Sequence, residues 1–312
     1  MPLLGTFGAG SSRGYGQKGG APKFIIATGG TETTDGDYRI HTFSSPGTLC
    51  ISCSGNPLGS DKIEYLVVAG GGGGGGFSLS PPFIGFGGYG GAGGYRQSSG
   101  ETAGSYPVGN TPTAALAAGV PGIPGLSGPV SVTVGGGGSP NSTPGSNSSF
   151  GPISSTGGGR GFNSTGGYFP GLPGGGGGQG GGGNAGGYSP PEGFGSGAGN
   201  GSQPAAFKGN GYSADGQNTL IQGPFPTTTI GESLNSTRWF SGRGGQHGED
   251  PPGLPVYPGG AGGGGAGTSG GAGQTNTGGG GGASGSSVSG GSGPTSGGAG
   301  GSGAVILRYK FQ

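Results

Sequence analysis

The sequence runs from Tyr65-Leu66-Val67-Val68-Ala69 directly into an unbroken glycine run, Gly70–Gly76. A short stretch rich in Val, Leu and Tyr is typical of a β-strand. A glycine run has no side chains to bury in a core, and glycine loses more backbone entropy on ordering than any other residue. The question for the fold is therefore how the glycine run that follows the strand can be ordered without side chains to bury.

The same junction of an apolar stretch and a glycine run recurs along the chain at irregular spacing. The junctions span residues 65–76, 130–138, 150–159 and 237–245, and longer glycine-rich stretches span 174–183, 259–267 and 278–282. The chain closes on a last apolar stretch, Ala304–Tyr309. Since a glycine array held at one end only would lose much entropy for little burial, we expect Tyr65–Val68 and Val305–Tyr309 to be neighbours in one sheet.

Glycine and proline dominate the composition, with 97 Gly and 26 Pro among 312 residues, and only 27% of the residues are hydrophobic. Such a chain cannot build a conventional core in proportion to its length. Collagen is excluded, because it needs glycine at every third position without interruption. Disorder of the whole chain is disfavoured, because only 7% of the residues are charged and strand-like stretches interrupt the glycine. Bundles of extended polyglycine II helices remain.

A polyglycine II helix has about three residues per turn and no internal hydrogen bonds, so its N–H and C=O groups point outward to neighbouring helices. Only glycine lets backbones approach one another that closely from all sides. We therefore expect central glycines such as Gly72 and Gly176 to face neighbouring backbones with no room for a Cβ atom. Hydrogen bonds and close packing then take the place of a large hydrophobic core.

The first part of the chain after the leader is β-like, and turn signals at Asp35-Gly36, Pro46-Gly47 and Asn56-Pro57 divide it. The expected strands are Phe24–Ile26, Tyr38–Phe43, Thr48–Ile51 and Ile63–Val68. No stretch shows helical periodicity, because Gly and Pro interrupt every window. The predicted fold class is therefore mostly β and irregular, with a small β region, a polyglycine II array closed by a C-terminal strand, and essentially no α-helix.

Four parts follow from this organisation. They are a leader (1–20), an N-terminal β region (21–69), a glycine-rich polyglycine II array with inserted loops (70–303) and a closing strand (304–312). The leader cannot bury enough apolar surface to fold alone. Because a mere linker would not need Leu3, Leu4 and Phe7, we expect these side chains to anchor the chain on another protein.

The charge balance limits the partners. The formal net charge is +1, and Lys and Arg do not cluster, whereas binding to a nucleic-acid backbone relies on clustered Lys and Arg. The first residues lack a basic segment followed by an apolar stretch, and no run approaches the roughly 18 apolar residues of a membrane span. We expect no nucleic-acid partner, no secretion through a signal peptide and no membrane insertion.

Residues able to bind a metal or catalyse a reaction are few. Cys50 and Cys53 form a Cys-x-x-Cys pair, but a zinc site needs about four ligands and the chain adds only His41 and His247. Gly-x-Gly-x-x-Gly matches are so numerous that they carry no nucleotide signal, and no βαβ unit accompanies them. The sequence predicts no metal site and no cofactor.

Paired carboxylates occur only in turn-like segments without a nucleophile nearby, which favours turn chemistry over catalysis. The pairs are Asp35 with Asp37 and Glu249 with Asp250. Aromatic side chains stand among glycine and proline in the middle of the chain. They either seal the glycine bundle, which is the favoured interpretation, or stack on a sugar or receptor surface. The candidates for such contact are Tyr168, Phe169, Tyr188, Phe207 and Tyr212. We expect a protein that is not an enzyme.

Blocks of non-glycine residues separate the glycine tracts at 27–43, 64–69, 93–96, 132–135, 147–157 and 305–312. In these blocks the chain resembles the glycine-rich tail-fibre and virion structural proteins of tailed phages, notably those that infect marine cyanobacteria. The resemblance covers nearly the whole chain. It implies a location in the virion and glycine tracts that pack as parallel and antiparallel polyglycine II helices.

The resemblance implies a tail-fibre or appendage subunit that contributes to host-surface attachment. The implied partners are other tail or baseplate proteins, which the leader would bind, a host receptor or glycan, and further copies of the chain, with a trimer as one option. A decoration or neck protein of the particle without a receptor role is the alternative within the structural class. An antifreeze or matrix protein built on polyglycine helices is a less favoured alternative from another class.

Overall fold

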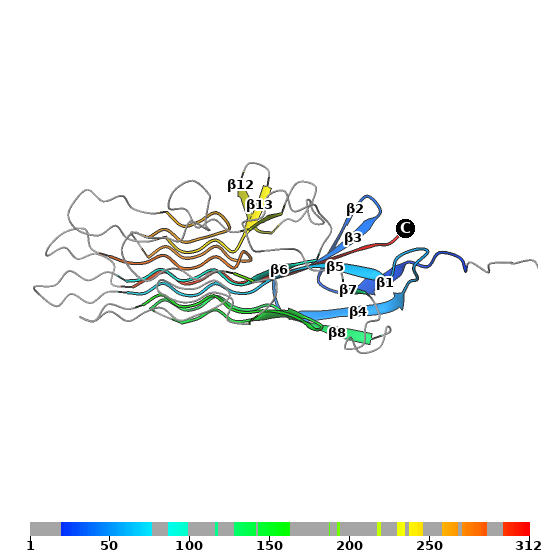
Figure 1. Cartoon of the computed structure of the whole chain (residues 1–312), viewed down its shortest axis with the longest axis horizontal. Helices are drawn as coiled ribbons and strands as arrows, with labels where there is room; N and C mark the ends of the chain where they lie inside the picture. The colour runs from blue at the N-terminus through cyan, green and yellow to red at the C-terminus, as the bar shows by residue number, and fades with distance from the viewer. Residues whose placement is uncertain are drawn as a thin grey trace, which may run out of the picture.

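The computed structural model is an elongated molecule, with β-sheets at one end and glycine tracts that run along its long axis from there (Figure 1). No α-helix occurs among the residues that the structure describes, which confirms the predicted fold class. The described residues are 20–76, 87–98, 116–117, 128–141, 143–162, 187, 192–193, 217–219, 230–234, 237–245, 258–267, 270–285 and 296–312.

The strands are short and most of them border a glycine tract. In chain order they are β1 (Ile25–Thr28), β2 (Thr31–Asp35), β3 (Tyr38–Phe43), β4 (Gly47–Ser54), β5 (Lys62–Val68), β6 (Tyr95–Gln97), β7 (Leu116–Ala117), β8 (Gly128–Thr133), β9 (Ser148–Phe150), β10 (Ile153–Ser155), β11 (Gln217–Thr219), β12 (Glu232–Leu234), β13 (Thr237–Phe240) and β14 (Ala304–Lys310).

The strands form three antiparallel sheets. One has five strands in the order β1-β4-β8-β9-β10, one has six in the order β2-β3-β14-β5-β6 with β7 also paired to β5, and one has three in the order β11-β13-β12. The first and last parts of the chain meet in the six-stranded sheet, where Val67 pairs with Val305 and Tyr65 with Leu307. The expected neighbourhood of Tyr65–Val68 and Val305–Tyr309 is confirmed.

The larger hydrophobic core lies between the five-stranded and the six-stranded sheet. Alternate residues of two adjacent strands point into it, namely Ile63, Tyr65 and Val67 of β5 and Val305, Leu307 and Tyr309 of β14. Across from them lie side chains of the five-stranded sheet, among them Ile25, Leu49, Ile51, Val132 and Phe150. This core joins the two sheets into a sandwich.

A second, smaller core covers the other face of the six-stranded sheet. Leu66 and Val68 of β5 and Ile306 of β14 pack there with Phe240 of β13. β5 and β14 are therefore buried on both faces, which explains why their sequences are continuous apolar runs. β1 faces a core on one side only, and its burial alternates from residue to residue.

Strands pass into glycine tracts without a loop, because both conformations lie in the extended part of backbone space. The junctions are Val68 to Gly70, Gly94 to Tyr95, Thr133 to Gly135, Asn147 to Ser148, Ser155 to Gly157 and Gly303 to Ala304, whereas between Phe240 and Gly242 the chain bends at Ser241, whose φ is 61°. All of them lie at the end of the array that carries the sheets, which we call the sheet end (Figure 1).

Candidate functional site

The tract 70–76 lies at the centre of the glycine array and donates its N–H groups to three other tracts. Gly70 and Gly73 donate to Ser146 and Thr143, Gly71 and Gly74 to Gly301 and Gly298, and Gly72 and Gly75 to Gly91 and Gly88, at 2.7–3.0 Å. In each pair the donor advances by three residues while the acceptor moves back by three. These three neighbours therefore run antiparallel to the central tract.

The carbonyl groups of the same tract accept from three further tracts. Gly70 and Gly73 accept from Gly158 and Gly161, Gly71 and Gly74 from Gly138 and Asn141, and Gly72 and Gly75 from Gly281 and Ser284. Donor and acceptor now advance together, so these neighbours run parallel. A repeat of about three residues and outward hydrogen bonds define a polyglycine II helix. The central tract is such a helix, with six neighbours around it.

The interior of the array leaves no space for side chains. A Cβ atom on Gly72 would overlap the carbonyl oxygen of Gly159 and lie 2.6 Å from its carbonyl carbon. A Cβ on Gly71 or Gly74 would overlap the backbone of another tract in the same way. The expected lack of room is confirmed for Gly72, whereas Gly176 lies outside the described residues.

The tracts come together again at the end opposite the sheets, which we call the far end. There Gly75 donates to Gly88, Gly88 donates to Phe162, and Ser284 donates to Gly75. The described chain breaks off at this end after Gly76, Phe162, Gly245 and Gly285, and it resumes there at Gly87 and Ser296. The far end is thus where several segments between the tracts begin.

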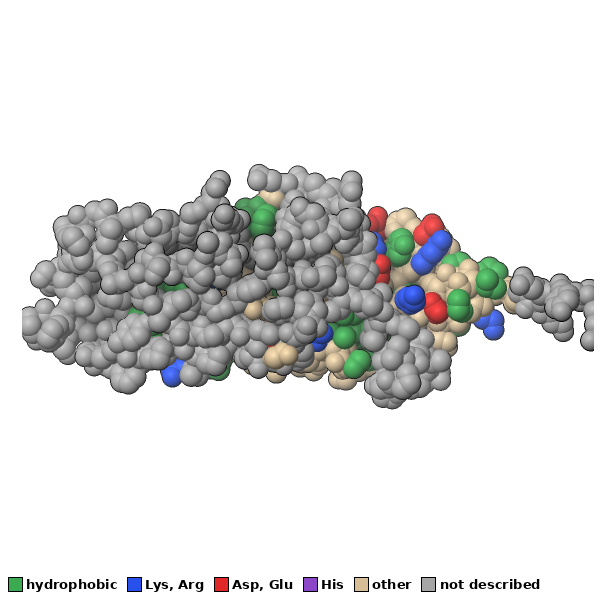
Figure 2. Space-filling view, viewed as in Figure 1, with side chains coloured by type: hydrophobic (Ala, Val, Ile, Leu, Met, Phe, Trp, Pro, Cys, Tyr) green, Lys and Arg blue, Asp and Glu red, His purple; other side chains and the backbone are tan. Residues whose placement is uncertain are grey.

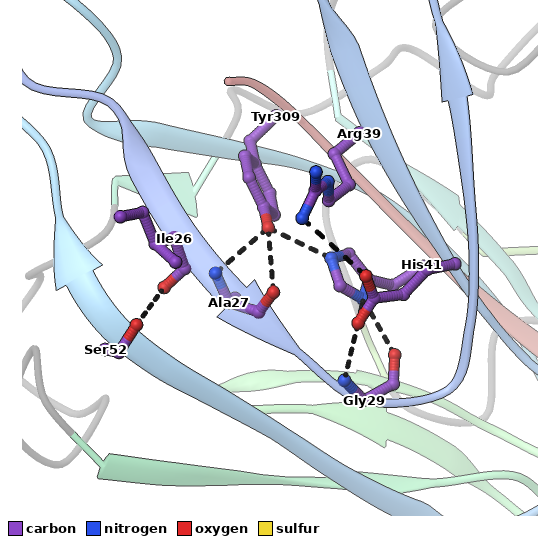
Figure 3. A network of polar contacts seen from close by, with 8 residues as sticks. Ile26, Ala27, Gly29, Arg39, His41, Ser52 and Tyr309 are labelled. Atoms are coloured by element: carbon purple, nitrogen blue, oxygen red, sulfur yellow. Dashed lines mark hydrogen bonds and ion pairs between the residues drawn. The ribbon is translucent and has the colours of Figure 1, made fainter. Parts of the chain in front are cut away.

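A buried polar network ties the first strand to the last at the sheet end (Figure 3). His41 of β3 is fully buried, with Nδ1 2.7 Å from the carbonyl oxygen of Gly29 and Nε2 3.0 Å from the hydroxyl of Tyr309. Because a carbonyl only accepts, Nδ1 of the neutral ring carries the proton, and Nε2 accepts from the Tyr309 hydroxyl, for which it is a nearer acceptor than the Ala27 carbonyl at 3.3 Å. The N–H of Ala27 in β1 donates to the same hydroxyl at 3.1 Å.

Two charged side chains border this network from the solvent side. Glu32 lies 3.9 Å from Nδ1 of His41 and 3.7 Å from Arg39. Burial lowers the pKa of His41, and the hydrogen bond to Gly29 and the charge of Glu32 oppose only part of that shift. Burial likewise raises the pKa of Tyr309. The network is therefore built for a neutral imidazole and a neutral phenol.

The lowered pKa of His41 predicts a pH-dependent stability. An unfolded histidine gains its proton near about pH 6.5, and the folded His41 gains it only at lower pH, so the unfolded chain binds more protons in between. Stability is complete above about pH 6.5 and falls as the pH drops toward the folded pKa, by up to about 1.4 kcal/mol per unit. Urea unfolding between pH 7 and pH 5 measures the slope.

His41→Gln is the matched variant, because glutamine keeps a polar group in the site and does not titrate. Its unfolding free energy is expected to be lower than that of the wild type at pH 7 but to change less between pH 7 and pH 5. His247 is present in both proteins, so its contribution cancels. Equal slopes for the two proteins would show that His41 does not titrate differently on folding.

The cysteines do not form a metal centre in the described part of the chain. Cys50 and Cys53 both lie in β4 as free thiols, the first exposed and the second half-buried. No group of three or more His, Cys, Asp or Glu side chains among the described residues could hold a metal ion. A search of the same residues finds no helix long and apolar enough to span a membrane.

The residues predicted to make contacts with partners lie outside the described residues. These are the leader residues Leu3, Leu4 and Phe7 and the aromatic candidates Tyr168, Phe169, Tyr188, Phe207 and Tyr212, and the same holds for His247, Glu249 and Asp250. Among the other carboxylates that the sequence singles out, Asp35 and Asp37 border the turn at Gly36 between β2 and β3, as expected.

Two polar features escape prediction from the sequence. His41 is considered there only as an isolated ligand, although the alternation in Tyr38–Phe43 places it on the same face as Phe43 and hence in the core. The second feature is Glu232, whose carboxylate accepts from the N–H groups of Gly262 and Gly263 at 2.6 and 2.8 Å. No local pattern signals that contact, because the partners lie about 30 residues apart.

Comparison with known proteins supplies a family for this architecture. No curated protein and no solved structure matches the chain. The model of the glycine-rich domain family matches residues 52–310, from within β4 to the last residue of β14, so the match includes all the described tracts of the array. With most of its length matched, the chain belongs to the glycine-rich domain family.

Proposed function

We propose that the protein is a structural subunit of a tailed-phage particle, a tail fibre or similar appendage, that contributes to attachment to the host surface. The resemblance of its non-glycine blocks to phage tail-fibre proteins suggests this role. The observation that carries the proposal is the axial order of the molecule: the strand-to-tract junctions lie at one end, and the described tracts stop at Gly76, Phe162, Gly245 and Gly285 at the other. A rigid, elongated molecule of this kind would keep its sheet end and its far end at a fixed distance from each other.

The leader joins the molecule at the sheet end. Asn56 fixes the residues that follow the leader, since its side chain accepts from the N–H of Lys23 and donates to the carbonyl of Ala21, both at 3.0 Å. Its own N–H donates to the carbonyl of Lys23, also at 3.0 Å. An anchor formed by Leu3, Leu4 and Phe7 would therefore be attached to a firmly held segment of the body.

The far end is the proposed host-facing end. The sequence leaves the described array at Phe162, and Tyr168 and Phe169 follow within the next seven residues. The segment 77–86, which connects Gly76 to Gly87, is also aromatic and apolar, with Phe77, Phe83 and Phe86. Aromatic side chains are suited to stacking on sugars and to filling receptor pockets. In this proposal the array presents them, and glycine tracts serve as the stalk.

Deletion of residues 2–16 tests the anchoring half of the proposal. The deletion touches no described residue, so the purified variant is expected to melt at the wild-type temperature. Phage particles that carry the deletion are expected to lack the protein, as measured by mass spectrometry of purified particles. Normal amounts of the shortened protein in the particles would contradict the anchoring role.

Replacement of residues 77–86 by a Gly-Ser segment of equal length tests the attachment half. The variant is expected to enter particles normally, because the leader is intact, while the particles adsorb to host cells more slowly than the wild type. For the leader deletion of the preceding experiment, the control is a full-length variant in which residues 2–16 are present in scrambled order. Unchanged adsorption of the 77–86 variant would favour a decoration or neck protein without a receptor role.

A further inference from the structure

Among the described residues, the outer tract 135–141 is hydrogen-bonded to half as many neighbouring tracts as the central tract. Its neighbours among the described residues are 70–76, through Gly138 and Asn141, and 297–303, whose N–H groups donate to Gly135 and Gly138. The third neighbour is 143–147, where Ser146 donates to Gly136. The central tract has six neighbours, so the outer tract is an open edge of the array.

The open directions carry unused backbone groups. The N–H groups of Gly136 and Gly137 donate to no residue that the structure describes. Gly136 is exposed, and a Cβ built on it meets no atom within 4 Å. A row of unpaired N–H and C=O groups at the edge of a β-sheet is a template for another chain, and the same reasoning applies to an open polyglycine edge.

The exposed face of this edge is uncharged. The stretch 128–149 contains no Asp, Glu, Lys, Arg or His. Thr133 at the end of β8 is exposed, as are Gly136 and Ser139 three and six residues further along the outer tract. The adjacent tract exposes Thr143 and Ser146. In Figure 2 most of the coloured charged side chains gather over the sheet end instead. Two copies of this face would bring no like charges together.

We propose that this outer glycine face, formed by Thr133, Gly136, Gly137, Ser139, Thr143 and Ser146, binds the same face of a second copy of the chain. A two-fold axis that runs parallel to the tracts pairs this patch with itself, keeps the tracts of the two copies parallel and so leaves both leaders at the same end. The array already accepts parallel neighbours around its central tract. The second copy thus supplies glycine backbone to the open directions of Gly136 and Gly137.

This inference deepens the proposed function, of which a homo-oligomer is part, and it is tested on the isolated protein without a phage particle. Sedimentation velocity across a concentration series is expected to show a monomer–dimer equilibrium. Gly136→Lys is expected to weaken the dimer by about tenfold or more, because an unpaired charge would be buried in the interface. Thr34→Lys adds the same charge on exposed β2 and is expected to leave the dimer unchanged.

Hydrogen exchange at the wild-type face gives a second readout that needs no variant. The amides of Gly136 and Gly137 are expected to exchange more slowly at high protein concentration than at low concentration. A wild-type protein that stays monomeric, or a trimer, would overturn the two-fold pairing, as would concentration-independent exchange at both amides. Loss of the protein from particles after deletion of residues 2–16 bears on the proposed function alone, so the two failures are distinguishable.

Discussion

Gly72→Ala is expected to destabilise the protein by about 3 kcal/mol or more, which lowers the melting midpoint by roughly 5–10 °C. The new methyl group would overlap the carbonyl of Gly159 and push the tract 156–162 away from the centre. Gly72 also donates to Gly91 and accepts from Gly281, so the displacement strains bonds to several tracts. Each buried polar group left unpaired costs about 1–3 kcal/mol. Thermal unfolding monitored by circular dichroism measures the loss.

At a protein concentration where the chain is monomeric, Gly136→Ala is the matched control, because it adds the same methyl group to an open edge of the same array. Its Cβ meets nothing within 4 Å, and Gly136 has no positive φ. Alanine restricts the unfolded chain more than glycine does, so the control is expected to be unchanged or more stable by about 0.4–1 kcal/mol. Equal melting of the Gly72 and Gly136 variants would mean that the central tract is not packed.

Removal of residues 304–312 is expected to abolish folding. β14 lies between β3 and β5 and pairs with both of them over most of its length. Val305, Ile306, Leu307 and Tyr309 are buried, and burial of four such side chains contributes about 6–12 kcal/mol. A domain is stable by only about 5–15 kcal/mol in total. Soluble yield and resistance to protease measure the result.

Removal of Phe311 and Gln312 alone is the control for this truncation. It deletes the hydrogen bond from Phe311 N–H to the carbonyl of Asp37 and the stacking of Arg39 on the Phe311 ring, but it leaves β14 complete. The loss is expected to be about 1–3 kcal/mol, because the Phe311 ring also packs against the larger core. A protein without residues 304–312 that melts like this control would show that the sheet does not need its last strand.

The positions of β3, β4, β5 and β14 and the meeting of β5 with β14 are accessible from the sequence, because they depend on local composition, whereas the polar and mostly exposed β2 is not. β5 and β14 are continuous apolar runs next to glycine, and a strand buried on both faces requires such a run. Asp35-Gly36 marks the hairpin between β2 and β3, since Gly36 adopts a positive φ. These features need no knowledge of distant residues.

The arrangement of the tracts is not accessible in the same way, because one glycine tract looks like another. Nothing in Gly70–Gly76 states which six tracts surround it. Side chains at the tract ends make contacts between particular tracts, such as Ser148, whose hydroxyl accepts from Gly135 N–H at 2.9 Å. The insertion of β8 between β4 and β9 is likewise a long-range choice. Such pairings depend on residues far apart in the chain, and no local sequence pattern indicates them.

The candidate functional site likewise has one part that the sequence predicts and another part that it does not. The lack of space at Gly72 follows from the chemistry of polyglycine II and could be predicted from the sequence. The link from His41 to Tyr309 joins residues 268 positions apart, and only the three-dimensional pairing of β3 with β14 brings them together. The expected contacts of the leader and of the aromatic residues fall outside the described part of the chain and stay predictions.

Residue-resolved amide hydrogen exchange tests most directly whether the glycine tracts are hydrogen-bonded helices in a packed array. At a protein concentration where the chain is monomeric, the amides of Gly71, Gly72 and Gly74 are expected to be protected, because each donates to a neighbouring tract at 2.8–2.9 Å. Gly136 and Gly137 have no such acceptor among the described residues and are expected to exchange rapidly. Exchange of the 70–76 amides as fast as that of Gly136 and Gly137 would contradict the packed array.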